Sequence, residues 1–352
     1  MATLLATGPM SAFEIRAATT ADEDGLYELA THLNTVNLPA DRGSIRHLLT
    51  TSEQSFSGAI QDLWRREYVF ALVDRSSERI VGTSMILAQL GRRDAPYIYL
   101  DVIDEERYSA TLDRHFKHTT LSIGYSYGGP TELGGLIVLP EYRQRIEKVG
   151  LLVSYVRFLF IKMHRLRFRD ELLAELLPPL ESDGRSHLWD ALGHQFTGLS
   201  YQEADRLSRR NKEFIRSLFP EGTIYASLLP EKAQAVIGKV GVKTRGVEKM
   251  LRRIGFRYAE RVDPFDGGPH FTAPTDDVTL IALAHQRTLA AGPAESSKGH
   301  ALVAVTVEES PFFRAVHAPY APAGPGGIIL PPETMARLQS RVGDQVWVLP
   351  VD

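Results

Sequence analysis

Apolar and polar residues alternate from Phe13 to Ala17, and a period of two is typical of a strand with one buried face. Residues 20–24 then supply a capping threonine and early acidic side chains, which favour the first turn of a helix. Apolar residues follow at helical spacing, at Leu26, Leu29 and Ala30. The pattern therefore predicts a strand that leads directly into a helix.

A hairpin and a strand–helix pair are predicted next. Residues 68–74 and 79–87 are rich in β-formers, and the polar turn 75–78 separates them. The apolar run 132–139 ends at a proline and predicts another strand. Apolar residues at helical spacing over 149–163 predict a long helix, so that a basic loop joins this strand to this helix.

The middle of the chain changes from strand to helix. Residues 171–177 predict one more strand, and the pattern is then mostly helical over 186–218, with Gly193 and Gly198 as expected breaks. We interpret residues 180–235, approximately, as a helical insertion. Together the elements predict an α/β protein of the α+β type, with a mixed sheet flanked by helices.

Composition along the chain predicts four parts. Residues 1–11 are expected to be a flexible N-terminus, and residues 12–285 a main domain that contains the insertion. Small residues and proline between 286 and 300 indicate a linker, and β-rich segments predict a small C-terminal β unit over 301–352.

Composition excludes several chemistries. Cysteine is absent from the 352 residues, so disulfides, thiolate zinc sites and a cysteine nucleophile are excluded. The net charge of −3 gives no overall basic field for nucleic acid or an anionic membrane. We find no membrane span and no signal peptide pattern, and we therefore expect a cytoplasmic protein.

The basic loop has the features of a pyrophosphate site. Arg143, Arg145, Lys148 and Gly150 lie between the predicted strand and the N-terminus of the predicted helix, where backbone N–H groups and the helix dipole attract anions. This order resembles the acyl-CoA signature of the GCN5-related N-acetyltransferase superfamily, although Lys148 takes the place of its middle glycine. A solvated basic loop is the alternative interpretation.

A closer resemblance, over residues 13 to about 272 and on to the C-terminus, is to the arginine N-succinyltransferase family. Its landmarks occur in family order, at Thr131-Glu132-Leu133, Pro140-Glu141-Tyr142-Arg143, Ala174-Glu175, Leu188-Trp189, Ala233 to Val240, Gly255-Phe256-Arg257-Tyr258 and Asp263 to Pro269. The resemblance implies an acyltransferase fold, succinyl-CoA as donor co-substrate with no permanently bound cofactor, and the α-amine of arginine as acceptor. Ornithine or another amine remains an alternative acceptor.

The same resemblance assigns residue roles. It implies a backbone contact of the donor at Leu136. Backbone N–H groups near Leu136 and Val138 are candidates to polarise the thioester carbonyl, with hydrogen bonding to neighbouring strands as their alternative role. The proton donor of the family, a histidine after Ile237-Gly238-Lys239-Val240, is replaced here by Gly241. His194 and His270, which lie near family-like motifs, are our candidates to replace it, and a histidine at 241 would restore the role if the backbone there tolerates a side chain.

Without a cysteine, we expect direct attack of a neutral amine on the thioester. Glu132 is the candidate base, with a strand-end ion pair as its alternative role. A guanidinium pairs with carboxylates in bidentate geometry, so Glu175, Asp263 and Asp266 are candidates for binding the acceptor. The two aspartates have an alternative role as caps of their turn. No metal site is predicted.

The C-terminal segment leaves another class of function open. Residues 327–346 resemble the β-turn-helix-β pattern of swapped-hairpin transcription-factor domains, but Arg337 and Arg341 are the only nearby basic residues. We therefore expect a packing or oligomerising unit in a homo- or hetero-oligomer, and no nucleic acid partner. A catalytically silent subunit that pairs with an active homologue is a further alternative, because of Lys148 and Gly241.

Overall fold

The chain divides into two compact units. The computed structural model describes residues 12–32, 38–93, 95–181, 184–208, 211–292 and 299–351. Unit 1 consists of Met1–Ala88, Leu133–Phe168 and Thr279–Asp352, and unit 2 of Gln89–Glu132 and Arg169–Val278. The division falls inside one strand, β6 (Thr131–Val138), between Glu132 and Leu133.

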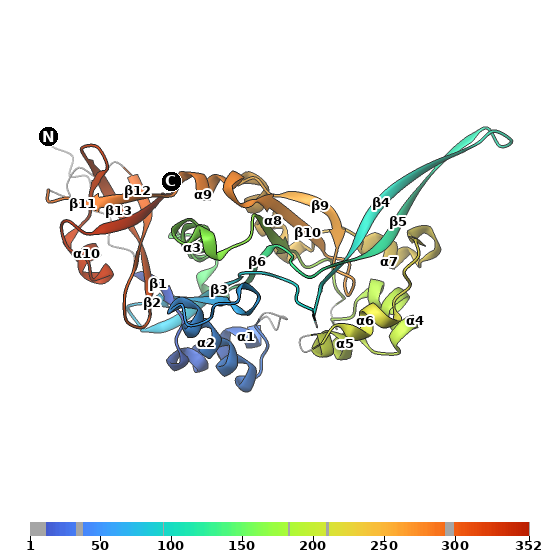
Figure 1. The fold of residues 1–352 in the computed structure, drawn as a ribbon, viewed down its shortest axis with the longest axis horizontal. Coiled ribbons are helices and arrows are strands. Elements are labelled where there is room, and N and C mark those ends of the chain that lie inside the picture. The colour runs from blue at the N-terminus through green and yellow to red at the C-terminus, as the bar shows by residue number, and fades with distance from the viewer. Residues whose placement is uncertain are drawn as a thin grey trace. The chain divides into compact units, whose positions relative to one another are not determined.

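Unit 1 contains a sheet with helices on both faces. Its strands lie in the order β13, β1, β2, β3 and β6, with β1 antiparallel to both of its neighbours. Helices α1 and α2 cover one face, and α3 covers the other (Figure 1). The bounds are Phe13–Ala17 for β1, Glu67–Asp74 for β2, Arg79–Leu87 for β3, Glu23–His32 for α1, Arg42–Phe56 for α2 and Val149–Met163 for α3.

Buried aromatic rings hold these layers together. Phe56 of α2 packs edge-on against Tyr68 and Phe70 of β2, with ring centroids 5.0 and 5.4 Å apart. Phe160 of α3 and Phe313 of β13 meet 5.3 Å apart. Burial of large aromatic side chains stabilises a fold strongly, so this cluster fixes how α2, α3 and β13 pack on β2.

The C-terminal part of unit 1 is a closed ring of five strands. Its order is β12, β15, β11, β14 and β13, and pairing of β12 with β13 closes the ring, which leaves no free edge within it. The elements are β11 (His285–Leu289), β12 (Gly299–Thr306), β13 (Phe313–Ala323), β14 (Gly327–Ile329), β15 (Gln345–Pro350), α9 (Thr279–Leu283) and α10 (Pro332–Leu338).

Unit 2 contains a second sheet. The first residues of β6 pair in parallel with β7, and the order continues antiparallel through β10, β9, β4, β5 and β8. The bounds are Glu171–Glu175 for β7, Pro269–Pro274 for β10, Arg257–Val262 for β9, Tyr97–Ser109 for β4, Arg114–Ser126 for β5 and Ile224–Tyr225 for β8.

The predicted helical insertion packs on β4 and β5. It holds a π-helix (Trp189–Gly193), α4 (His194–Thr197), α5 (Tyr201–Ser208), α6 (Glu213–Leu218) and α7 (Glu231–Val236), and α8 (Arg245–Arg253) follows. Trp189 is fully buried and stacks on Phe265 at 4.9 Å. The prediction that Gly193 breaks the helix is wrong, because the helix continues through it. A Cβ there would lie 2.3 Å from the Trp189 ring, so packing requires this glycine.

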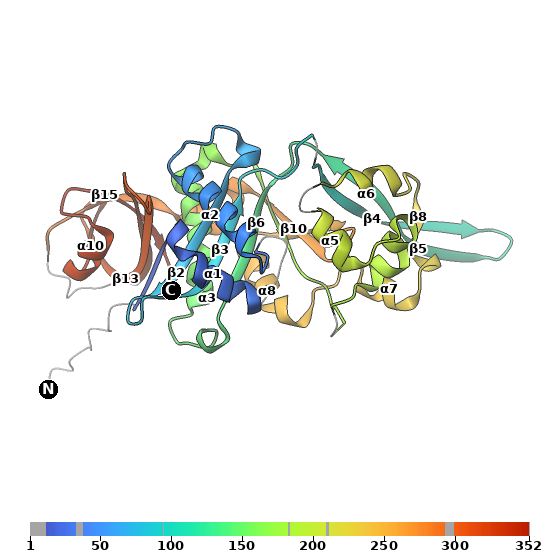
Figure 2. The same cartoon turned by 90° about the horizontal axis from the view of Figure 1, so that it is seen from below.

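The hairpin of β4 and β5 was not predicted. It is a long two-stranded ribbon (Figure 2). Beyond its pairing with β9 and β8 the ribbon is covered on neither face, and Ile103, Tyr108 and Phe116 are 51%, 54% and 41% exposed. Since neither face is buried there, the sequence lacks the apolar alternation that would have indicated strands.

Most predicted elements are confirmed. Predicted helix 149–163 coincides with α3, and strand 13–17 with β1. The predicted α+β class with mixed sheets and flanking helices is confirmed. In place of a linker over 286–300, β11 occupies His285–Leu289 and β12 begins at Gly299, while residues 293–298 and the expected flexible residues 1–11 lie outside the described part.

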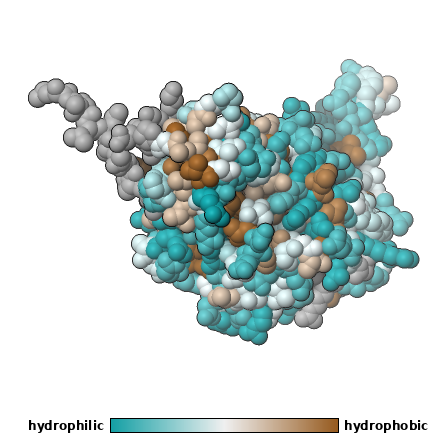
Figure 3. All heavy atoms as spheres, turned by 60° about the vertical axis from the view of Figure 1, so that its left-hand side comes forward, coloured by the Kyte–Doolittle hydropathy of each residue, from teal (hydrophilic) through white to brown (hydrophobic). Residues whose placement is uncertain are grey.

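Across the described ranges, no helix combines the length and apolar character that a bilayer crossing requires. On the face drawn in Figure 3, hydrophilic residues predominate and hydrophobic ones form small separate groups.

Candidate functional site

A cluster of carboxylates and a histidine forms in unit 2, where β7, β10 and the turn after β9 meet. Glu175 ends β7 and pairs in register with His270 of β10. Asp263 follows β9, and one ligand atom from each of Glu175, Asp263 and His270 lies within 4.8 Å of the others. We name Glu132, Glu175, Asp263, Asp266 and His270 the acid–histidine cluster. All five are candidates predicted from the sequence, from separate segments of the chain except for the two aspartates, and the fold brings them together.

His270 is the best enclosed member of the cluster. Its residue surface is 0% exposed, and its Nδ1 lies 2.7 Å from the Tyr97 hydroxyl. Its Nε2 has no hydrogen-bond partner in the described structure and lies 3.5 Å from Glu175 Oε1. Burial lowers the pKa of His270 to about 3, so the imidazole is neutral at pH 7. A neutral ring whose Nδ1–H donates to Tyr97 presents a free lone pair at Nε2.

Glu175 is the most exposed member of the acid–histidine cluster, and 34% of its side-chain surface reaches water. Burial, followed by the charges of Glu132 and Asp263, raises the pKa of Glu175 well above its usual range. Among the described residues it forms no ion pair with a lysine or arginine. A cationic ligand would therefore relieve the repulsion that Glu175 experiences.

Asp263 and Asp266 build the turn between β9 and β10. Asp263 Oδ1 accepts hydrogen bonds from the backbone of Phe265 and Asp266, at 2.7 and 3.1 Å. Asp266 Oδ1 accepts one from Gly268 at 2.7 Å. Burial raises the pKa of both aspartates, and the charge of Asp263 raises that of Asp266 further. One carboxylate oxygen of each aspartate, Oδ1, thus caps the turn.

Two contributors to the cluster escaped sequence analysis. Tyr97 orients His270 through the hydroxyl contact, and burial raises the pKa of Tyr97, which stays a phenol. The positive charge of Lys212 partly offsets the rise in the pKa values of Glu175 and Asp263. Neither residue lies in a motif, and only the tertiary fold brings them to β7 and β10.

Glu132 and His194, the other two candidate catalytic residues, lie in different environments from one another. Glu132 is 7% exposed, pairs across from Leu173 of β7, and lies close enough to Glu175 to raise its pKa. His194 is exposed on α4, with its Nδ1 3.0 Å from the Leu199 carbonyl. His194 thus has a local contact in the insertion, and no contact with the acid–histidine cluster is present among the described residues.

Glu175, Asp263 and His270 also form a donor set for a metal ion, the one such group found in the described ranges. Carboxylate oxygens and an imidazole suit several divalent cations. The same carboxylates suit a guanidinium or an ammonium group equally well. The sequence-based prediction of no metal stays a prediction.

The predicted donor-binding residues lie in unit 1. Leu136 is half-buried in the middle of β6, and Val138 is buried near its end. Arg143 donates from Nε to the Val138 carbonyl at 2.8 Å. The guanidinium of Arg145 lies over the rings of Phe13 and Tyr142, at 5.4 and 5.2 Å. Arg143 is thus anchored to the strand that precedes the loop, and Arg145 to Phe13 of β1 and to Tyr142.

Lys148 adopts the conformation usual for glycine. Its φ of 50° is left-handed, directly before the first turn of α3. The loop therefore keeps the backbone form that the missing glycine would favour. At Gly150 a Cβ would meet nothing closer than Val138, at 3.9 Å, so the protein itself leaves space there.

Gly241 cannot easily hold the histidine that the family resemblance implies. Its φ of −64° suits any residue, but a Cβ would lie 2.6 Å from the Pro178 carbonyl oxygen and 2.9 Å from that of Leu177. The backbone N–H of Gly241 also donates to Leu177 at 2.8 Å. Space, and not the backbone angle, excludes a side chain.

We therefore expect Gly241→His to lose about 1–3 kcal/mol of stability without a gain in kcat, because the backbone must move to admit the ring. Urea unfolding and steady-state assays measure the two quantities. Gly246→His is the matched control, since nothing lies within 4 Å of a Cβ at that position in α8. A stable Gly241→His variant with raised kcat would contradict this prediction.

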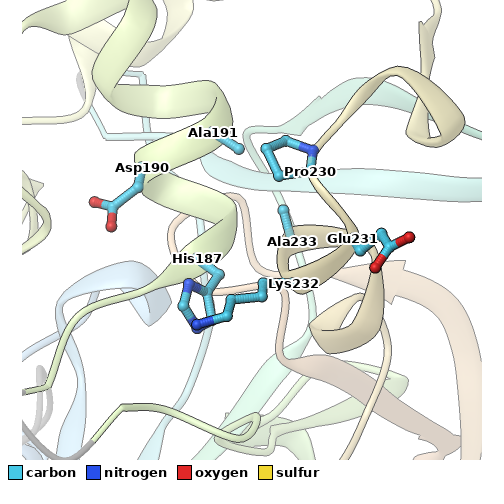
Figure 4. Close-up of a pocket in the computed structure, with 7 residues that line it drawn as sticks. All are labelled: His187, Asp190, Ala191, Pro230, Glu231, Lys232 and Ala233. Atoms are coloured by element: carbon cyan, nitrogen blue, oxygen red, sulfur yellow. The ribbon is translucent and has the colours of Figure 1, made fainter.

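A separate open pocket of about 400 Å³ lies in the insertion. It is lined by His187, Asp190, Ala191, Pro230, Glu231, Lys232 and Ala233. Figure 4 shows His187 and Lys232 side by side, and His187 Nε2 lies 2.7 Å from Glu181. None of the candidate site residues lines this pocket, so we assign it no part in the chemistry.

Comparison with known proteins assigns the chain two family matches. The model of the arginine N-succinyltransferase beta subunit matches residues 13–280, and that of its C-terminal domain matches residues 285–350. The second match covers the segment that resembled transcription-factor domains.

Individual relatives give the same result. The chain is 33% identical to the arginine N-succinyltransferase subunit beta of Pseudomonas aeruginosa over 341 residues, which cover 96% of this chain and 98% of the relative. It is 32% identical to the arginine N-succinyltransferase of Yersinia pestis, over 78% of this chain and 79% of the relative. The solved structure of arginine/ornithine succinyltransferase subunit AI from Pseudomonas aeruginosa matches with a TM-score of 0.81 and 28% identity, over 97% of this chain and 99% of that one.

Proposed function

Since the chain belongs to the arginine N-succinyltransferase beta subunit family, we propose that it transfers the succinyl group of succinyl-CoA to the α-amine of arginine. Ornithine is the second candidate acceptor, because a similar solved structure carries both names. The bond from the acyl carbon to sulfur breaks, a bond from the acyl carbon to nitrogen forms, and the amine proton leaves. The products are the N-succinyl amino acid and CoA.

The observation that carries the proposal is the acid–histidine cluster. Three carboxylates with raised pKa values lie close together and lack a lysine or arginine ion pair in the described structure. Arginine brings a planar cation that pairs with carboxylates in bidentate geometry. Of the three, Glu175 is the best acceptor-binding residue, because neither of its oxygens caps the backbone and part of it reaches water.

The same cluster supplies a proton acceptor. In the tautomer whose Nδ1–H donates to the Tyr97 hydroxyl, His270 Nε2 carries a lone pair that has no hydrogen-bond partner in the described structure. With a pKa of about 3 the unliganded imidazole is a weak base. A bound cation favours the charged form of Glu175, and a carboxylate 3.5 Å from Nε2 raises the basicity of His270. Acceptor binding therefore prepares the base, with Glu132 as the alternative base.

The donor is held in unit 1. Unpaired N–H groups at the start of the 15-residue helix α3, together with Arg143, Arg145 and Lys148, suit a pyrophosphate. Backbone groups of β6 near Leu136 and Val138 are candidates to polarise the thioester carbonyl. Because the pyrophosphate is common to CoA and to all acyl-CoA thioesters, this site does not distinguish among acyl groups.

Arg145→Ala is expected to raise the Kd values of CoA and of succinyl-CoA by a similar factor, about 10-fold, because both ligands carry the same phosphates. Isothermal titration calorimetry measures both. Arg253→Ala, an exposed arginine at the end of α8, is the matched control. Equal affinity of wild type and Arg145→Ala for both ligands would remove Arg145 from the site.

Release of CoA from succinyl-CoA by the purified chain, across arginine, ornithine, lysine and other amines, tests the proposed function. We expect turnover on the order of 1 s⁻¹ or faster with arginine or ornithine. No turnover by the chain alone, with full activity after a homologous subunit is added, would instead support the silent-subunit alternative. Assembly with another chain and a cytoplasmic location belong to the same proposal, and the relatives named subunit beta and subunit AI support the former.

A further inference from the structure

Unit 1 contains a buried arginine that has no acidic partner. Arg157 lies in the middle of α3 and is 3% exposed. Its hydrogen bonds go to neutral acceptors, from Nε to the Ser154 carbonyl at 3.1 Å, from Nη2 to Ser154 Oγ at 2.7 Å and from Nη1 to the Gly134 carbonyl at 3.3 Å. Within the described ranges no carboxylate pairs with it, and burial lowers the pKa of Arg157 to about 9.

Burying an isolated cation is unfavourable in free energy, and the penalty is smaller when an anion pairs with the cation. A guanidinium has five N–H donors, and the three hydrogen bonds of Arg157 leave two of them available. Two parallel N–H groups match a carboxylate or phosphate. Arg157 is therefore preorganised for an anionic group that arrives with a ligand.

The strand beside Arg157 is shaped for close approach. Gly134 and Gly135 interrupt β6, and Gly135 has a φ of 57°. A Cβ at Gly135 would lie 2.6 Å from the sulfur of Met85, so a side chain is excluded there. Residues 134–136 are half-buried, whereas the strand residues on either side are buried. This stretch of β6 is thus the part that is open to a ligand.

We propose that Arg157 binds the free carboxylate of the succinyl group and so selects a dicarboxylic acyl-CoA as the donor. The inference rests on the proposed function, in which the thioester lies against β6 near Leu136. Gly134, whose carbonyl Arg157 contacts, is two residues from Leu136, so the guanidinium and the thioester would contact the same short stretch of β6. Only two methylene groups separate the carboxylate of a succinyl group from its thioester carbonyl, so the carboxylate stays near that stretch. An acyl group without a carboxylate leaves the positive charge of the guanidinium without a counter-ion.

The test compares succinyl-CoA with butyryl-CoA, which has the same number of acyl carbons and no carboxylate. We expect wild type to prefer succinyl-CoA in kcat/KM, and Arg157→Gln to reduce this preference by about 10- to 100-fold. Most of the change should come from succinyl-CoA, while butyryl-CoA loses far less. Arg157→Lys keeps the charge and should retain part of the preference. An equal loss for both donors would mean that Arg157 only anchors β6 to α3, and would overturn the proposal.

Binding of non-reactive thioether analogues of the two donors gives a second measurement, which needs no turnover. Wild type is expected to bind the succinyl analogue more tightly than the butyryl analogue. Equal affinities overturn the proposal even if Arg157→Gln does not fold. If neither acyl-CoA supports transfer to any amine, the proposed function fails, whereas transfer with unchanged preference in Arg157→Gln overturns only the assignment of Arg157.

Discussion

Replacement of His270 by asparagine is expected to lower kcat for succinyl transfer by about 10²- to 10⁴-fold, the usual contribution of a general base. The amide retains a donor toward Tyr97 but lacks the lone pair at the position of Nε2. The KM for arginine should change little, because the carboxylates remain. Steady-state kinetics with saturating succinyl-CoA measure both quantities.

Two further variants separate this role from the alternatives. Tyr97→Phe leaves the imidazole in place and removes the hydroxyl that orients it, so we expect a smaller loss of kcat. His194→Asn tests the other candidate histidine, which is exposed on α4. If His194→Asn carries the large loss and His270→Asn does not, the proton acceptor lies in the insertion and our assignment is wrong. A raised KM with unchanged kcat in His270→Asn would make His270 a binding residue.

Glu175→Gln is expected to raise the KM for arginine by about 10- to 100-fold, the value of a charge-assisted hydrogen bond, while the KM for succinyl-CoA stays the same. Glu171→Gln is the matched control, since Glu171 is an exposed residue of the same strand. An equal rise of both KM values would show that Glu175 supports the fold of the site and not the acceptor.

Glu175→Gln should also stabilise the protein without ligand, although it weakens the binding of arginine. The pKa of Glu175 is raised in the folded protein, so the folded state binds more protons than the unfolded state, and stability falls as pH rises from the usual glutamate pKa through the raised one. Glu175→Gln removes this dependence, and its Tm should exceed that of wild type at pH 8 more than at pH 5. Thermal unfolding without ligand measures this, and a lower Tm at both pH values would contradict it. A binding residue that costs stability in the free protein is common at functional sites.

Elements with one buried face could be predicted from the sequence. The alternation of Phe13 to Ala17 and the apolar positions of 149–163 reflect the burial of β1 and α3 in unit 1, and both predicted bounds agree with the structure. The sequence of β4 and β5 shows no apolar alternation over the exposed half of the ribbon. The continuation of a helix through Gly193 depends on contact with Trp189, which no local pattern reveals.

The site shows the same limit. Motifs identified Glu132, Glu175, Asp263, Asp266 and His270, but not that one oxygen of each aspartate caps the turn. Tyr97 and Lys212 act on the cluster from distant parts of the chain, and their roles follow from tertiary contacts alone. Arg157 belongs to no motif in the sequence, and the role proposed for it depends on its contact with β6 beside Gly135.

The pairing of β1 with β13 has a consequence for synthesis on the ribosome. Glu14 and Arg314 are 300 residues apart in the chain, and their side chains meet at 2.5 Å. At about 5–20 residues per second, the β13 side of β1 waits roughly 15–60 s for its partner to be translated. During that time the strand has an open edge, and Glu14, 1% exposed in the finished protein, lacks Arg314 and pairs with Arg75, at 3.5 Å. Unit 1 therefore completes its fold only after almost the whole chain has emerged, and nascent chains stalled before Phe313 should be strong clients of chaperones that cover strand edges.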